Sequence, residues 1–310
     1  MARRFTLRRF SRVIAVVLGE VSISGERIHE LKTVVVGSAG MLGCDLVEAV
    51  GAAGWEACGF DLPAIDITDP DSVEAVLPED ADVVINCAAY TRVDDAESER
   101  ELAVSINGDG AGNLARVCAA RGVRMLQLST DYVFDGKGTR PYREEDPVEP
   151  INAYGASKLE GERQVMDAGG PHLVVRAQSL FGVHGPSFVR AIRRKLDEGS
   201  EPLRVVNDQV CSPTYTRHLA EAIVALIESG STGIVHVRAS GECSWWEFAG
   251  AIAEQCSPGT TVYPVPSSVY PTPAARPAYS IIDCTRYQEW TKRAMPHWRE
   301  GLAAFLGEKP

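Results

Sequence analysis

From Lys32 onward, short apolar runs rich in β-branched residues alternate with amphipathic stretches rich in Ala, Leu and Glu, and this alternation constrains the fold most. Continuous apolar strands indicate a parallel sheet that is buried on both faces. We therefore predict an α/β fold with a doubly wound parallel sheet, whose ligands bind at the carboxyl ends of the strands. The predicted strands are residues 33–37, 55–60, 82–86, 123–129 and 172–176, and the predicted helices lie near 41–53, 98–121 and 153–168.

The pattern loosens after about residue 176, which indicates a second, smaller lobe. We predict a dinucleotide-binding domain at 32–178, to which 207–238 return, and a C-terminal substrate lobe made of 179–206 and 239–310. Further helices are predicted near 187–198, 212–229, 245–256 and 297–306, the second with a capped start. Residues 1–31 are interpreted as a basic N-terminal extension, because their apolar stretch is short for an export signal and no cleavage site follows it.

Composition narrows the class of ligand. The formal charge of −11 opposes binding to nucleic acid, and no apolar run is long enough to span a membrane. The eight cysteines form no CxxC pair, and neither they nor the six histidines cluster at metal-ligand spacing. We expect a cytoplasmic protein without a bound metal that acts on a soluble small molecule.

The sequence GSAGMLG (37–43) directly follows the first predicted strand and opens the first helix. Gly37 permits a tight turn, Gly40 lets a pyrophosphate approach the backbone, and Gly43 lets helix and strand pack closely. The helix N-terminus adds amide donors and positive potential. We predict a Rossmann-like dinucleotide site here, although the same spacing also occurs in simple packing turns.

Two acidic residues follow at the spacing expected for contacts with the adenosine. Asp61 ends the second strand, where a carboxylate accepts ribose hydroxyls and repels an additional phosphate, so NADH is slightly favoured over NADPH. The alternative for Asp61 is a loop cap. Asp66 fits an adenine contact and a cap of the next helix equally well.

The spacing of Tyr154 and Lys158 places both side chains on one helical face, with the ammonium near the phenol. A nearby cation favours the phenolate and so lowers the pKa of a tyrosine towards a useful acid/base range. Thr130 lies at the carboxyl end of the fourth strand, where its hydroxyl can bind the substrate oxygen. These three residues are the predicted catalytic group of an NAD(P)-dependent oxidoreductase.

Several segments together resemble the dTDP-4-dehydrorhamnose reductase family of extended short-chain dehydrogenases: GSAGMLG, CAAYTRVDDAE, STDYVFDG, YREEDPVEPINAYGASKLEGE, DQVCSPTYT and YPTPAARP. The resemblance covers nearly everything from Lys32 to the C-terminus. It implies NAD(P)H-dependent reduction of the C4 ketone of a nucleotide-linked 6-deoxyhexulose, and it implies a homodimer. Family dimers bridged by magnesium use acidic residues, and Asp45 stands at one such position, but we predict no metal there.

By position, the resemblance implies that Tyr154 donates the proton, Lys158 holds the nicotinamide ribose and Thr130 orients the sugar. It also implies contacts to the sugar at Asp131 and Tyr132, to the pyrophosphate at Gly40, Met41 and Leu42, to the adenine at Asp66 and Ile67, and a wall beside the cofactor at Ala88, Ala89, Tyr90 and Thr91.

One departure concerns Ser179, which stands where the family carries a tryptophan that stacks on the sugar. Its loss removes an apolar platform and opens volume, so a different polar ketone is an alternative substrate. A further alternative is a non-catalytic regulatory subunit, because the β subunit of methionine adenosyltransferase shares the YREED and SDYVFDG-like segments.

Overall fold

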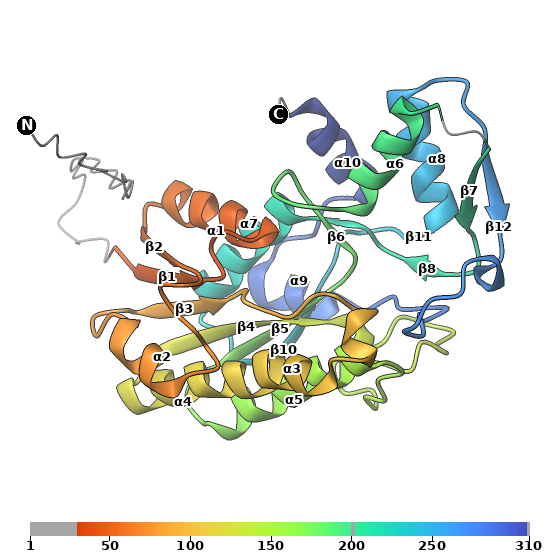
Figure 1. Ribbon diagram of the computed structural model, residues 1–310. Helices are drawn as coiled ribbons and strands as arrows, with labels where there is room; N and C mark the ends of the chain where they lie inside the picture. The colour runs from red at the N-terminus through yellow and green to blue at the C-terminus, as the bar shows by residue number, and fades with distance from the viewer. Residues whose placement is uncertain (1–29, 200–201, 309–310) are drawn as a thin grey trace, which may run out of the picture.

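The apolar runs form one parallel sheet, as predicted (Figure 1). The computed structural model describes residues 30–199 and 202–308, so the predicted extension 1–31 lies almost wholly outside the described residues. In spatial order the strands are β10 (Gly233–Val237), β5 (Leu173–Ala177), β4 (Arg124–Thr130), β3 (Val83–Asn86), β1 (Lys32–Val36) and β2 (Glu56–Phe60). The order reverses between β1 and β3, and ligands of such sheets bind at this reversal.

Helices cover both faces of the sheet (Figure 1). One face carries α1 (Met41–Ala52) and α7 (Thr216–Glu228), and the other carries α2 (Pro70–Val76), α3 (Arg100–Val104), α4 (Ala111–Arg121) and α5 (Ala153–Asp167). A π-helical turn at Ser105–Gly110 joins α3 to α4, so the predicted helix over 98–121 is only partly regular.

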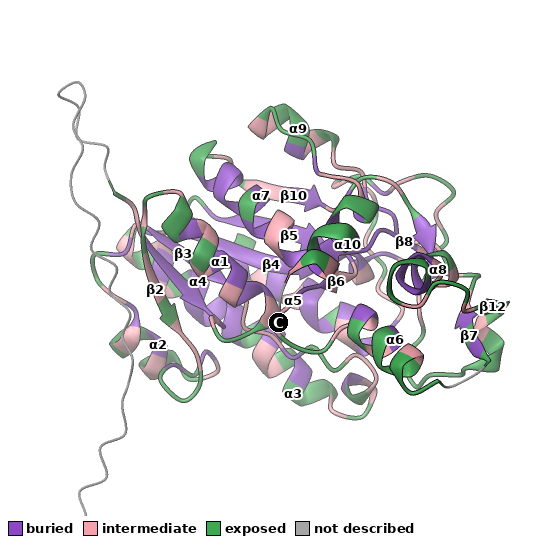
Figure 2. Ribbon diagram, turned by 90° about the horizontal axis from the view of Figure 1, so that it is seen from above, coloured by how far each residue is buried: buried purple, intermediate pink, exposed green. Residues whose placement is uncertain are grey.

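Consecutive residues of the central strands pack in two different hydrophobic cores, one on each face of the sheet. Val35 and Ile85 pack on the α1 and α7 side, whereas Val34 and Val84 pack on the α4 side. This alternation follows from the two-residue period of a strand. Figure 2 shows that β3, β4 and β5 are buried, because both of their faces are covered.

A second group of elements lies beyond the carboxyl ends of the strands (Figure 1). Phe181, Tyr215, Phe248, Trp298 and Phe305 form the centre of its core. Its elements are β6 (Leu180–Phe181), α6 (Phe188–Asp197), β7 (Leu203–Val206), β8 (Val210–Cys211), β9 (Thr214–Tyr215), β11 (Cys243–Ser244), α8 (Trp245–Cys256), β12 (Val262–Val265) and α10 (Trp298–Gly307).

The structure differs from the sequence prediction at three places. β8 pairs with β11, so the chain returns to the sheet later than residue 207. Helix α9 (Thr285–Thr291) was not predicted, and its Tyr287 packs in the sheet core beside α7 and β10. Finally, α7 begins at Thr216 after Tyr215, which makes no side-chain cap.

Candidate active site

The glycine loop has the backbone that a dinucleotide site requires. Gly37 has φ +81°, a conformation that L side chains rarely adopt, and a Cβ there would meet the Ala88 amide. A Cβ on Gly43 would overlap the carbonyl of Gly37, so this glycine lets α1 approach β1 closely. Both glycines therefore have the geometry expected for a tight turn and for close packing of helix and strand.

The first turn of α1 presents amides that suit an anion. Gly40 is the N-cap and is exposed, and no described side chain caps this helix end. The amides of Met41 and Leu42 in this turn, together with the helix dipole, fit a pyrophosphate.

Asp61 lies at the carboxyl end of β2 and supports the same loop. Its Oδ2 accepts a hydrogen bond from the Ala39 amide at 3.0 Å, and its Oδ1 accepts one from the Leu62 amide at 2.8 Å. The side chain is half-exposed, so each oxygen keeps lone-pair capacity for a ribose hydroxyl. The loop-capping alternative and a ribose contact are thus compatible.

Asp66 does not cap the next helix. Asp69 is the N-cap of α2 and accepts from the Asp71 amide, whereas Asp66 accepts from both the amide and the hydroxyl of Thr68. Ile67 is buried, and its carbonyl accepts a hydrogen bond from Asn113.

The segment after β3 lies beside the glycine loop, where the resemblance predicts a wall next to the cofactor. The Ala88 amide donates to Asn86, and the Tyr90 amide donates to Asn107. Ala88 and Ala89 are half-buried, Tyr90 is buried and Thr91 is exposed.

Thr130, Tyr154 and Lys158 come together at the carboxyl end of β4. Asn152 caps α5 by accepting from the Gly155 amide at 2.8 Å, which fixes the start of the helix that carries Tyr154. The Thr130 hydroxyl lies beside the Tyr154 side chain, and its proximity favours the ionised form of the phenol. Lys158 is buried, and its Nζ donates to the Leu128 carbonyl at 2.6 Å.

The electrostatics of Tyr154 correct one sequence expectation. Burial and the charge of Asp131 raise the pKa of Tyr154 to about 12, whereas a neighbouring lysine was expected to lower it. Lys158 instead points to the backbone of β4, and burial lowers its pKa to about 8. Tyr154 is therefore a neutral phenol at pH 7, which is the form that donates a proton.

Asp131 is buried rather than open to a sugar. Its Oδ1 accepts from the Thr130 hydroxyl, and its Oδ2 accepts from Gln178 Nε2, each at 3.1 Å. Burial raises the pKa of Asp131 to about 6. A direct contact between Asp131 and the sugar was predicted. In this structure the Asp131 carboxylate instead accepts hydrogen bonds from Thr130 and Gln178.

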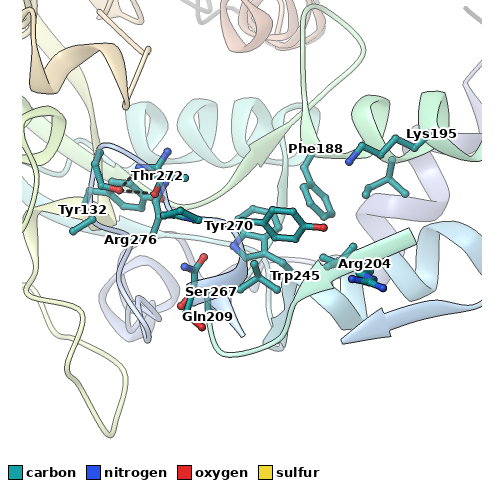
Figure 3. Close-up of a pocket in the computed structure, with 17 residues that line it drawn as sticks. Tyr132, Phe188, Lys195, Arg204, Gln209, Trp245, Ser267, Tyr270, Thr272 and Arg276 are labelled. Carbon is teal, nitrogen blue, oxygen red and sulfur yellow. Dashed lines mark hydrogen bonds between the residues drawn. The ribbon is translucent and has the colours of Figure 1, made fainter. Parts of the chain in front are cut away.

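A cavity of about 610 Å³ lies beside this group, and Tyr132 connects the two. The Tyr132 ring packs edge-on against Tyr154, with centroids 5.9 Å apart, and also lines the cavity. Figure 3 shows Phe188, Trp245 and Tyr270 gathered in the cavity, with cationic side chains around them. The cations are Lys195, Arg204 and Arg276.

Ser179 lies outside the lining of this cavity. It has φ +49°, a left-handed conformation that is strained for serine, and its carbonyl accepts from the Thr214 amide. The expectation that Ser179 opens volume for the substrate stays a prediction.

The comparisons with known proteins agree with this geometry. The family described as "RmlD substrate binding domain" matches residues 31–309. The dTDP-4-dehydrorhamnose reductase of Mycobacterium tuberculosis (strain H37Rv) is 39% identical, over 89% of this chain and 92% of that protein. The chain belongs to the dTDP-4-dehydrorhamnose reductase family.

Two further relatives are similar to this chain over nearly their whole length. The spore coat polysaccharide biosynthesis protein SpsK of Bacillus subtilis (strain 168) is 40% identical, over 90% of this chain and 98% of that protein. A dTDP-4-dehydrorhamnose reductase from Bacillus anthracis, solved in complex with NADP, superposes with a TM-score of 0.86 at 37% identity. That similarity covers 90% of this chain and all of the other.

The sequence motifs identified the residues at the sheet edge, but they did not identify most of the residues that line the cavity. Phe188, Trp245 and Tyr270 come from three distant segments and carry no local motif. Arg276 belongs to the YPTPAARP segment, which was noted only for its resemblance; its guanidinium pairs with Asp94 at 2.9 Å.

Within residues 30–199 and 202–308, no three His, Cys, Asp or Glu side chains gather as a metal site. Over the same residues, no helix has both the length and the apolar character needed to cross a membrane.

Proposed function

We propose that this chain uses NAD(P)H to reduce the C4 ketone of a dTDP-linked 4-keto-6-deoxysugar. The observation that carries the proposal is the meeting of Thr130 and Tyr154 at the sheet edge, with Tyr132 joining them to a cavity. Family membership and the names of the relatives support it.

The nicotinamide cofactor is supported by the glycine loop and the first-turn amides of α1, which suit a pyrophosphate. When bound, NAD(P)H supplies the hydride for the reduction. Asp61 supports a preference for NADH, because its carboxylate accepts ribose hydroxyls and repels a 2′-phosphate. A relative has been solved with NADP, so we expect this preference to be modest.

Each of the three site residues has a distinct task in this proposal. Tyr154, neutral at pH 7, gives its hydroxyl proton to the ketone oxygen as the alcohol forms. Thr130, whose hydroxyl donates to Asp131 in this structure, turns its proton to that same oxygen and holds it beside the phenol. Lys158, charged below a pKa of about 8, binds the nicotinamide ribose.

The cavity fits the rest of a nucleotide sugar. The rings of Phe188 and Trp245 lie 4.6 Å apart at their centroids and offer an apolar face to a base. Arg204 and Lys195 line the same cavity and supply positive charge for a diphosphate. We propose that the sugar points from there past Tyr132 towards Tyr154.

The test is oxidation of NADH or NADPH by purified protein in the presence of dTDP-4-dehydrorhamnose. The proposal expects consumption of the cofactor in proportion to the sugar reduced. Binding of the cofactor without turnover of any dTDP-4-ketosugar would reject it. Co-purification with a synthetase instead would favour the regulatory-subunit alternative.

A further inference from the structure

Glu162 lies beneath the site, one helical turn after Lys158 on α5, and is buried with 3% of its surface exposed. Its Oε1 accepts hydrogen bonds from the Ser129 hydroxyl and from Arg176 Nε, and its Oε2 accepts from Arg176 Nη2 at 2.7 Å. Ser129 and Arg176 are themselves register partners on β4 and β5. The Glu162 carboxylate thus connects α5 to β4 and β5, and its contact on β4 is Ser129, the residue before Thr130.

Two buried cations lie near the single carboxylate of Glu162. Lys158 and Arg176 are both buried cations, and Glu162 is the carboxylate that acts on both. The other titratable groups next to these two cations are neutral at pH 7. His236 lies beside Arg176, and burial lowers its pKa to about 3. Cys87 faces Lys158, and burial raises its pKa to about 12. The guanidinium stays charged in proteins, so Lys158 is the group whose charge can change.

Lys158 is held between two opposing effects. Burial disfavours its charged form and lowers its pKa to about 8, while the negative charge of Glu162 raises it. The geometry places the two charges close together, because Lys158 bonds the Leu128 carbonyl and Glu162 bonds the hydroxyl of Ser129, the next residue of β4.

We propose that Glu162 is a positioning residue that keeps Lys158 charged at neutral pH and holds α5 against the strand end that carries Thr130. The inference rests on the proposed function, because that function gives the charge of Lys158 its purpose. Loss of the proton from Lys158 then ends tight cofactor binding as the pH rises.

The experiment compares two changes at one position. Glu162→Gln keeps the size and removes the charge, whereas Glu162→Asp keeps the charge and shortens the side chain. The matched control is Glu160→Gln on the same helix, where the side chain is half-exposed and bonds Gln164. The dissociation constant of NADH, followed by its fluorescence, and kcat/KM are measured from about pH 6 to about pH 10, a range that spans the lysine pKa. Lys158→Met assigns the alkaline loss of binding to Lys158.

Glu162→Gln should move the alkaline loss of NADH binding to lower pH by about one unit or more. Glu162→Asp and Glu160→Gln should leave its position within about 0.3 units of wild type, well below the effect of a removed charge. An unmoved profile in folded Glu162→Gln, as judged by circular dichroism, would overturn the inference.

Arg176→Gln provides an independent variant if Glu162→Gln does not fold. Removing this cation frees the carboxylate to act on Lys158, so the alkaline loss should move to higher pH. A shift to lower pH would overturn the inference. NADH binding is measured without the sugar, so the test of Glu162 does not depend on turnover. A wild type that binds NADH but reduces no ketosugar would reject the proposed function, and the binding profiles would still test the role of Glu162.

Discussion

Tyr132 and Tyr154 pack edge to face, with ring centroids 5.9 Å apart and planes at 81°. Tyr132 also lines the cavity, so one aromatic contact joins the proposed proton donor to the space proposed for the substrate. The contact thus assigns a direction to the proposed binding site, which runs from the cavity, past Tyr132, to Tyr154 near the carboxyl end of β4.

Replacing Tyr132 by alanine should therefore weaken substrate binding more than cofactor binding. An aromatic contact is worth about 0.5–1.5 kcal/mol, so KM for the nucleotide sugar should rise roughly 2- to 13-fold. Steady-state kinetics measure this, and the Kd of NADH should stay near wild type. Tyr263→Ala is the matched control, because Tyr263 is 47% exposed and does not line the cavity. Equal KM values in the two variants would argue against the assigned direction.

Replacing Tyr154 by phenylalanine should remove most turnover. Only the hydroxyl is lost, and general acid catalysis is typically worth about 10²- to 10⁴-fold in kcat. The Kd of NADH should remain nearly unchanged, which serves as the internal control. A fall of less than about tenfold in kcat with saturating substrate would mean that another group donates the proton.

Cofactor choice is tested at Asp61. Asp61→Asn still accepts the Ala39 amide but loses the charge, so the ratio of NADPH to NADH dissociation constants should fall by about tenfold, or about 1.4 kcal/mol. Fluorescence titration with both cofactors measures the ratio. Asp71→Ala, at an exposed carboxylate on α2, should leave it unchanged. Equal affinities for both cofactors in the wild type would remove the proposed role of Asp61.

Asp131 gives a prediction about pH and stability. Its folded pKa is raised to about 6 from 3.8, so folding favours the protonated acid, and that stabilisation is lost as the pH rises through about 6. Asp131→Asn stays neutral, so its free energy of unfolding relative to wild type should increase between about pH 4 and pH 7, by up to about 3 kcal/mol. Urea denaturation at both pH values measures this.

Asp135 provides a control of opposite sign for that measurement. Its hydrogen bond from the Tyr142 hydroxyl lowers its pKa, so its contribution is present above pH 3.8 and lost in acid. Asp135→Asn should therefore lose stability relative to wild type as the pH rises. If both variants changed in the same direction with pH, the assignment for Asp131 would be wrong.

The sequence predicted the parts of the site that depend on local spacing. GSAGMLG between a strand and a helix, and Tyr154 four residues before Lys158, each depend on one turn of chain, and the structure has both as described above. The sheet followed from the apolar runs, because strands buried on both faces leave little alternative.

The remaining features depend on tertiary contacts. The cavity gathers Phe188, Trp245 and Tyr270 from three segments, which no local pattern connects. The direction of Asp131 was misread because the chain turns into a 3-10 helix at Asp131–Val133, which sends Tyr132 to the cavity and Asp131 towards Gln178. The pKa of Tyr154 was misread because Lys158 bonds the Leu128 carbonyl instead.

The most direct test of the account is the fate of the hydride. Purified protein is given NADH carrying deuterium at the transferable C4 position, together with dTDP-4-dehydrorhamnose, and the product is examined by mass spectrometry and NMR. The account predicts one deuterium, located at C4 of the reduced sugar, and almost none with Tyr154→Phe. A product without deuterium at C4, or no product from a wild type that binds NADH, would contradict the central claim.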